Sequence, residues 1–167
     1  MNIYITSGTI DYLQKLRDTY PNEVMLLMDS EENTLLLHES SNHTFFKAPR
    51  GYEVIVSLGT FCTDGLIVMH HIPVSDEARP IFEHQFISLP RLIKSLNGLK
   101  AIRLLRPLSS NTFIILTQWE NQSAYEEHKA ILNSQVNKGI ENWLQVSPKM
   151  FTSSLYISKY NVLEMNS

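Results

Sequence analysis

The sequence has very little cysteine and no long apolar run. One cysteine, Cys62, occurs among 167 residues, so no disulfide can form within the chain. This usage is typical of a reducing compartment, and we expect a cytoplasmic protein with a buried, unreactive thiol. No apolar stretch approaches the roughly 20 residues that cross a bilayer, so we expect no transmembrane segment. The first residues lack a basic segment followed by an apolar one, and no signal peptide is predicted.

Concentrated positive charge is also missing. The chain has 14 Lys and Arg against 17 Asp and Glu, a formal charge of −3. Because binding to phosphate backbones needs clustered cations, nucleic acid is not an expected partner. Walker, GxGxxG, GxSxG and HExxH motifs are absent, and one cysteine excludes a CxxC zinc site. The 43% of hydrophobic residues predicts a folded core, in one domain or two small halves.

The second half of the chain has a regular order of expected elements. A strand over 66–73 precedes a helix that starts at 75–77. Two strands follow at 101–106 and 113–119, then a helix from Ser123 and a closing strand at 152–160. The order strand, helix, strand, strand, helix, strand is that of the ferredoxin-like fold.

The first half repeats part of this order. Strands are predicted at 2–6, 24–28 and 34–38, with a helix at 10–20. Residues 50–59 are assigned to a helix, because Tyr52, Ile55, Val56 and Gly59 follow helical spacing. We therefore predict an α+β protein with two ferredoxin-like halves in one chain, residues 1–64 and 65–167.

Two histidines are candidate functional residues. On the strand at 66–73, His70 shares a face with Leu66, Val68 and Ile72, while His71 points to the opposite face. His128 is expected on the buried face of the helix from Ser123. Each ring is either a core histidine with a hydrogen-bond partner or a group that ligates a metal or transfers a proton. A pocket that contains both would favour function.

Longer segments resemble a known family. GLIVMHHIPVSDEARPIFEHQF and AIRLLRPLSSNTFIILTQWENQSAYEEHK, with YITSGTIDYLQ and KAPRGYEVI before them, resemble the antibiotic-biosynthesis-monooxygenase (ABM) domain of IsdG-like heme-degrading enzymes. The whole chain is similar to the long HmoB/TRAP group of that family. The resemblance implies a dimeric α+β barrel of ferredoxin-like units, formed either by one chain as a pseudo-dimer or by a homodimer.

The resemblance also implies a ligand and a set of site residues. Family enzymes bind heme, with an Asn on the strand, a Trp on the later helix and an axial His ten residues further on. These positions hold His70, His128 and Lys138 here. The implied catalytic residues are His70 and His128, and the implied cofactor-binding residues are His70, His128 and Lys138. The implied ligand is heme or another flat apolar molecule, and an active enzyme would also need an electron donor.

Three functions remain open at this point. The protein binds heme without the usual axial histidine, or it is an enzyme of altered chemistry in which His70 donates the hydrogen bond of the family's Asn, or it is a non-enzymatic signal-transduction protein. An open cavity bordered by His70 and His128 would favour the first two functions. A pocket filled by side chains would favour the third.

Overall fold

A computed structural model describes residues 1–146 and 155–164, the side chains of 141–146 excepted. Its strands are β1 (Asn2–Ser7), β2 (Val24–Asp29), β3 (Thr34–Ser40), β4 (Arg50–Gly59), β5 (Leu66–Pro73), β6 (Leu99–Pro107), β7 (Thr112–Trp119) and β8 (Tyr156–Val162). Its helices are α1 (Ile10–Thr19), the short 3₁₀ turn η1 (Asp76–Ala78), α2 (Arg79–Phe86), α3 (Leu89–Ile93) and α4 (Gln122–Val146). The expected closing strand lies here as β8, and residues 152–154 of that prediction lie outside the described residues.

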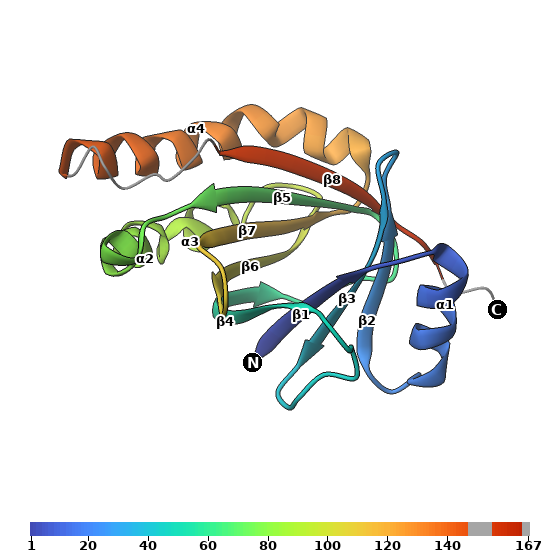
Figure 1. Cartoon of the computed structure of the whole chain (residues 1–167). Helices are drawn as coiled ribbons and strands as arrows, with labels where there is room; N and C mark the ends of the chain where they lie inside the picture. The colour runs from blue at the N-terminus through green and yellow to red at the C-terminus, as the bar shows by residue number, and fades with distance from the viewer. Residues whose placement is uncertain (147–154, 165–167) are drawn as a thin grey trace.

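The strands close into one barrel in the order β1-β3-β2-β8-β5-β7-β6-β4, with every neighbouring pair antiparallel (Figure 1). The run β8-β5-β7-β6 has the strand order of a ferredoxin-like unit, which confirms the predicted α+β fold. The run β4-β1-β3-β2 places its first, second, third and fourth strands in the same relative order. The division of the chain at residue 64 stays a prediction.

Two seams join these runs, and they differ in length. Seven residue pairs join β4 to β6, from Tyr52 with Pro107 to Gly59 with Ala101. Only two pairs join β2 to β8, Met28 with Val162 and Asp29 with Asn161. The barrel is therefore held closed on one side by a long ladder and on the other by a short one.

The predicted helix over residues 50–59 is wrong, because this segment is strand β4. The register of β4 against β6 shifts between Val54 and Val56, which marks a β-bulge. A bulge adds one residue and so breaks the two-residue alternation of inward and outward side chains. The strand lacks alternation for this reason, and its apolar residues fall at spacings that imitate a helix.

Apolar side chains pack in three places. The barrel interior holds one core, which includes Ile67 and Met69 of β5. A second core fills the space between the outer face of β5, β6 and β7 and helices α2 to α4, and a third lies under α1. Figure 1 shows the long α4 running beside β8 and β5. None of the helices within the described residues is both long and apolar enough to cross a membrane.

Candidate functional site

His70 lies on the helix-covered face of β5, where the alternation of the strand predicted it. All eight residues of β5 are buried, which explains why its sequence is an almost continuous apolar run. Val68 and Ile72 belong to the core beneath the helices. His70 is 1% exposed, and its Nε2 lies 3.0 Å from Oδ1 of Asn133 on α4. The strand and the long helix are thus linked by a polar contact within an apolar layer.

The hydrogen bond to Asn133 assigns the protons of this imidazole. An amide oxygen only accepts, so Nε2 of His70 donates and Nδ1 carries the lone pair. Nδ1 is buried and has no hydrogen-bond partner among the described residues. Burial lowers the pKa of His70, and the contact with Asn133 opposes that effect only in part. The ring is therefore neutral at pH 7 and offers one unused nitrogen.

A small pocket borders this ring. We call it the His70 pocket; it has a volume of about 230 Å³ and is lined by His70, Asn133, Val136, Asn137, Leu155 and Ile157. Sites for drug-sized ligands and cofactors usually measure about 300–1,000 Å³. The His70 pocket is suited to a molecule smaller than these.

His128 does not line the His70 pocket. Its ring lies beside Trp119, with centroids 6.2 Å apart and planes 20° from parallel. Nε2 of His128 is buried without a partner among the described residues, although the residue as a whole is half-buried. The structure therefore places both candidate imidazoles on the helix-covered side of the sheet but does not join them in one cavity.

Lys138 is exposed on α4 and lines a separate groove of about 430 Å³. This groove shares Asn133 and Asn137 with the His70 pocket, so the two hollows adjoin along the helix. Lys138 thus lies near the His70 pocket without lining it. Within the described residues, no group of three or more His, Cys, Asp or Glu side chains could hold a metal ion.

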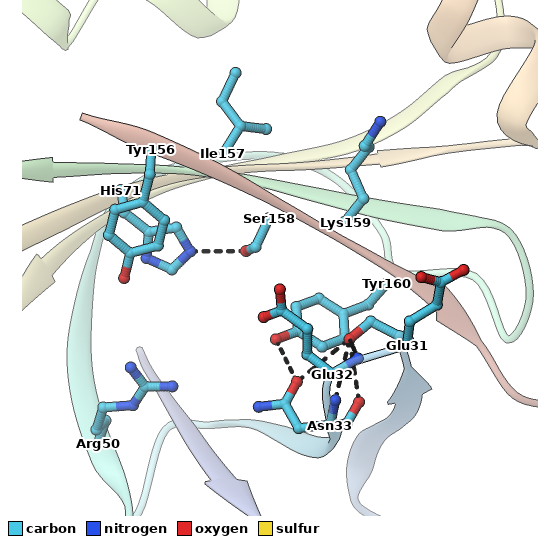
Figure 2. Close-up of a pocket in the computed structure, with 11 residues that line it drawn as sticks. Glu31, Glu32, Asn33, Arg50, His71, Tyr156, Ile157, Ser158, Lys159 and Tyr160 are labelled. Atoms are coloured by element: carbon cyan, nitrogen blue, oxygen red, sulfur yellow. Dashed lines mark hydrogen bonds between the residues drawn. The ribbon is translucent and has the colours of Figure 1, made fainter. Parts of the chain in front are cut away.

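His71 faces the barrel interior, opposite to His70. Its Nε2 lies 2.8 Å from Oγ of Ser158, and its ring stacks on Tyr156 with centroids 4.2 Å apart (Figure 2). Burial lowers the pKa of His71 to about 4, and the positive charge of Arg50 and the neighbouring His70 act in the same direction. These contacts border the largest of the cavities described here, about 700 Å³. Sequence reasoning assigned His71 to this face but gave no sign of its partners.

The eight-stranded barrel, with its ferredoxin-like run of strands and its helix-covered sheet, is an α+β fold of the ferredoxin-like kind. Residues 65–131 match the family model for antibiotic biosynthesis monooxygenase (ABM). Relatives extend the likeness beyond that segment. The signal transduction protein TRAP of Staphylococcus epidermidis is 26% identical over 140 residues, 83% of this chain and 84% of that protein. A heme-degrading monooxygenase of Listeria monocytogenes is 27% identical over 140 residues, 84% of this chain and 82% of the enzyme.

Solved structures share the fold over nearly the whole chain. One described as a major regulator of staphylococcal pathogenesis has a TM-score of 0.81 and 21% identity, covering 99% of this chain and 100% of that one. The heme-degrading enzyme LmHde of Listeria monocytogenes has a TM-score of 0.74 and 24% identity, covering 96% and 99%. At these identities the likeness establishes the fold, and function has to be argued from the site.

The helix-covered face does not fit a heme group in this structure. The unused nitrogens of His70 and His128 are chemically suitable iron ligands. However, the His70 pocket is small, and the layer beside it is filled by large side chains that have almost no exposure, among them Phe82, Phe86 and Trp119. Helices α2 and α4 approach so closely that a Cβ at Gly139 would lie 2.7 Å from Phe86. Within the described residues the donor atoms are present, but the His70 pocket itself is smaller than the usual site for a cofactor.

Proposed function

We propose that this chain is a non-enzymatic ligand-binding protein of the ABM fold that does not degrade heme. The function implied is closer to that of the relatives named signal transduction protein than to that of the relative named heme-degrading monooxygenase. The observation that carries the proposal is the small His70 pocket beside a fully packed helix-covered layer. The ligand class is a small apolar molecule, because the pocket walls other than His70 and two asparagines are aliphatic.

The proposal is supported by what His70 does in the fold. Its Nε2 is engaged by Asn133, and its ring is almost fully buried, so it is held in place as a wall of the pocket. A neutral imidazole places no charge at the pocket wall, which suits an apolar ligand. Its companions Val136 and Ile157 supply apolar contact.

Binding of toluene tests the pocket. An apolar cavity of about 150 Å³ is large enough for a benzene-sized molecule, so toluene fits the His70 pocket. Toluene should raise the thermal unfolding temperature of the wild-type protein in a saturable manner, since a ligand that binds only the folded state stabilises it. Asn137→Phe, which places a ring at the pocket wall from an exposed position, should abolish the rise. Ile131→Phe, at an exposed position of the same helix, should leave it unchanged.

Hemin titration tests the loss of heme chemistry in the same protein. We expect no saturable shift of the Soret band that depends on His70, and no bleaching of hemin with reductant and oxygen beyond that of free hemin in the presence of catalase. His70→Ala should therefore behave like His84→Ala, which changes an exposed histidine on α2. Bleaching by the wild type that is lost in His70→Ala would overturn the proposal in favour of an enzyme.

A second candidate function is heme binding without degradation. It is favoured by the buried, unpartnered nitrogens Nδ1 of His70 and Nε2 of His128, and by the relative named heme-degrading monooxygenase. A stable Soret shift in the wild type that disappears in a His70→Ala/His128→Ala double variant would support this candidate. It would also require α4 to move away from β5, which faster deuterium exchange of backbone amides in α4 and β5 on titration would report.

A further inference from the structure

The largest of the cavities described here lies on the other side of β5 and β8 from the His70 pocket. We call it the Arg50 cavity; its wall is formed by the β2–β3 turn, the start of β4, His71 of β5 and strand β8, with about 700 Å³ of space. Figure 2 shows Ser158 and Tyr160 projecting from β8 toward the cavity, and Ile157 and Lys159 projecting away from it on the opposite face. This volume is typical of sites for small organic ligands.

One cation at this cavity has no partner. The guanidinium of Arg50 is exposed and makes no hydrogen bond or ion pair with the described residues, whereas those of Arg103 and Arg106 each bind a carboxylate. The charge of Arg50 acts on the pKa values of Tyr52 and His71, so it lies close to the aromatic side of the cavity. A guanidinium without a protein partner at the wall of a cavity is suited to bind a carboxylate in a bidentate manner.

An aromatic wall lies next to this cation. The Tyr156 ring stacks against His71 at an interplanar angle of 6°, and His71 is fixed from behind by Ser158. Tyr156 is 52% exposed, so the ring face that does not touch His71 is open to solvent. Because aromatic rings prefer offset stacking on such a surface, the wall favours a planar ligand.

The remaining charges of the cavity lie at its other end. Glu31 and Glu32 lie in the exposed β2–β3 turn beside Tyr160; in Figure 2 Glu31 points away from Arg50 and His71, and the Glu32 carboxylate lies between Tyr160 and the end of the cavity that holds them. Lys159 is directed outward and lies over the ring of Tyr125, with its Nζ 5.6 Å from the ring centroid. The end of the cavity that contains Tyr156 is therefore cationic and aromatic, and the opposite rim is acidic.

We propose that the Arg50 cavity binds a small aromatic carboxylate. Arg50 holds the carboxylate and Tyr156 holds the ring, and the acidic rim keeps the anionic end of the ligand at Arg50. This site is independent of the function proposed above, because it lies on the opposite face of β5 and uses none of the same side chains except Ile157, whose side chain projects away from this cavity.

Calorimetric titration with 2-naphthoate, and with neutral 2-naphthamide for comparison, tests the site. We expect saturable binding of the naphthoate and much weaker binding of the amide. Arg50→Gln should weaken naphthoate binding about tenfold or more, since a hydrogen-bonded charge contact is lost. The matched control Arg91→Gln, at an exposed arginine on α3, should leave the affinity unchanged. Tyr156→Ala should weaken binding of both probes by a smaller factor.

Two results would overturn the proposal. One is the absence of saturable naphthoate binding at millimolar concentration. The other is equal affinity in wild type, Arg50→Gln and Arg91→Gln, which would mean that the carboxylate is held elsewhere. Asn137→Phe separates this site from the His70 pocket, because it should abolish the effect of toluene and leave naphthoate binding intact. Failure of either function can then be recognised without reference to the other.

Discussion

Removal of the partner of His70 should destabilise the protein although the replacement is a better helix former. Asn133→Ala leaves the buried ring with two unpartnered nitrogens, since Nδ1 already lacks a partner. An unsatisfied buried polar group costs about 1–3 kcal/mol. Replacing Asn by Ala within a helix returns at most ~0.7 kcal/mol. The penalty exceeds the gain over the whole of this range, so we expect a net loss of roughly 0.3–2.3 kcal/mol.

Thermal and urea unfolding followed by circular dichroism measure this loss. For a chain of this size, 1 kcal/mol corresponds to about 2–4 °C in unfolding temperature. The matched control is Asn137→Ala, which changes an exposed asparagine one turn further along α4. Among the described residues His70 bonds to Asn133 and not to Asn137, so this variant receives only the gain in helix propensity. The double variant His70→Leu/Asn133→Leu removes both polar partners and should be more stable than the sum of its single variants predicts. Equal stability of Asn133→Ala and Asn137→Ala would refute the reasoning.

Three further predictions concern the barrel. The pKa of His71 is about 4 in the folded state against 6.5 for a free imidazole, so the unfolded chain takes up a proton first as the pH falls. Between pH 6.5 and 4 the free energy of unfolding should therefore decline by roughly 2–3 kcal/mol more in wild type than in His71→Gln. Urea unfolding at several pH values measures this difference. Gly65→Ala should lower the free energy of unfolding by about 1–3 kcal/mol, since Gly65 has φ +96° and a Cβ would lie 2.2 Å from the carbonyl oxygen of Trp119. Gly8→Ala should be tolerated in the same assay, because the atom nearest to its Cβ would be 3.4 Å away. Glu39→Gln should lower the free energy of unfolding by about 3–5 kcal/mol, because it leaves the charge of buried Arg103 uncompensated. An unfolding midpoint equal to that of wild type would contradict this estimate.

Local patterns predicted the elements that have simple periodicity. The apolar run of β5 and the ferredoxin-like order of the second half follow from the sequence, and strand alternation placed His70 and His71 on opposite faces. Strand β4 was missed because its bulge at Val54 and Val56 removes the alternation on which such a prediction depends. Neither the closed barrel nor its cavity was visible in any local pattern, since closure depends on pairings between distant segments.

The candidate site was also predicted only in part, because its contacts join residues that lie far apart in the sequence. The side of the sheet that carries His70 follows from its neighbours, but its partner Asn133 is 63 residues away. Ser158 and Arg50 meet His71 from two other strands, at separations that no motif encodes. The roles of His70, His128 and Lys138 in ligand binding stay predictions, as does a cytoplasmic location.

The short seam between β2 and β8 gives the barrel a preferred line of opening. With two residue pairs there against seven between β4 and β6, fewer hydrogen bonds must break along this line before the strands separate. Local opening free energies follow such differences, and backbone amides near the short seam should exchange with deuterium sooner than those of the long one. The Arg50 cavity borders this line through β8 and the β2–β3 turn. We therefore expect the part of the Arg50 cavity along β8 and the β2–β3 turn to open to water more often than the part along β4.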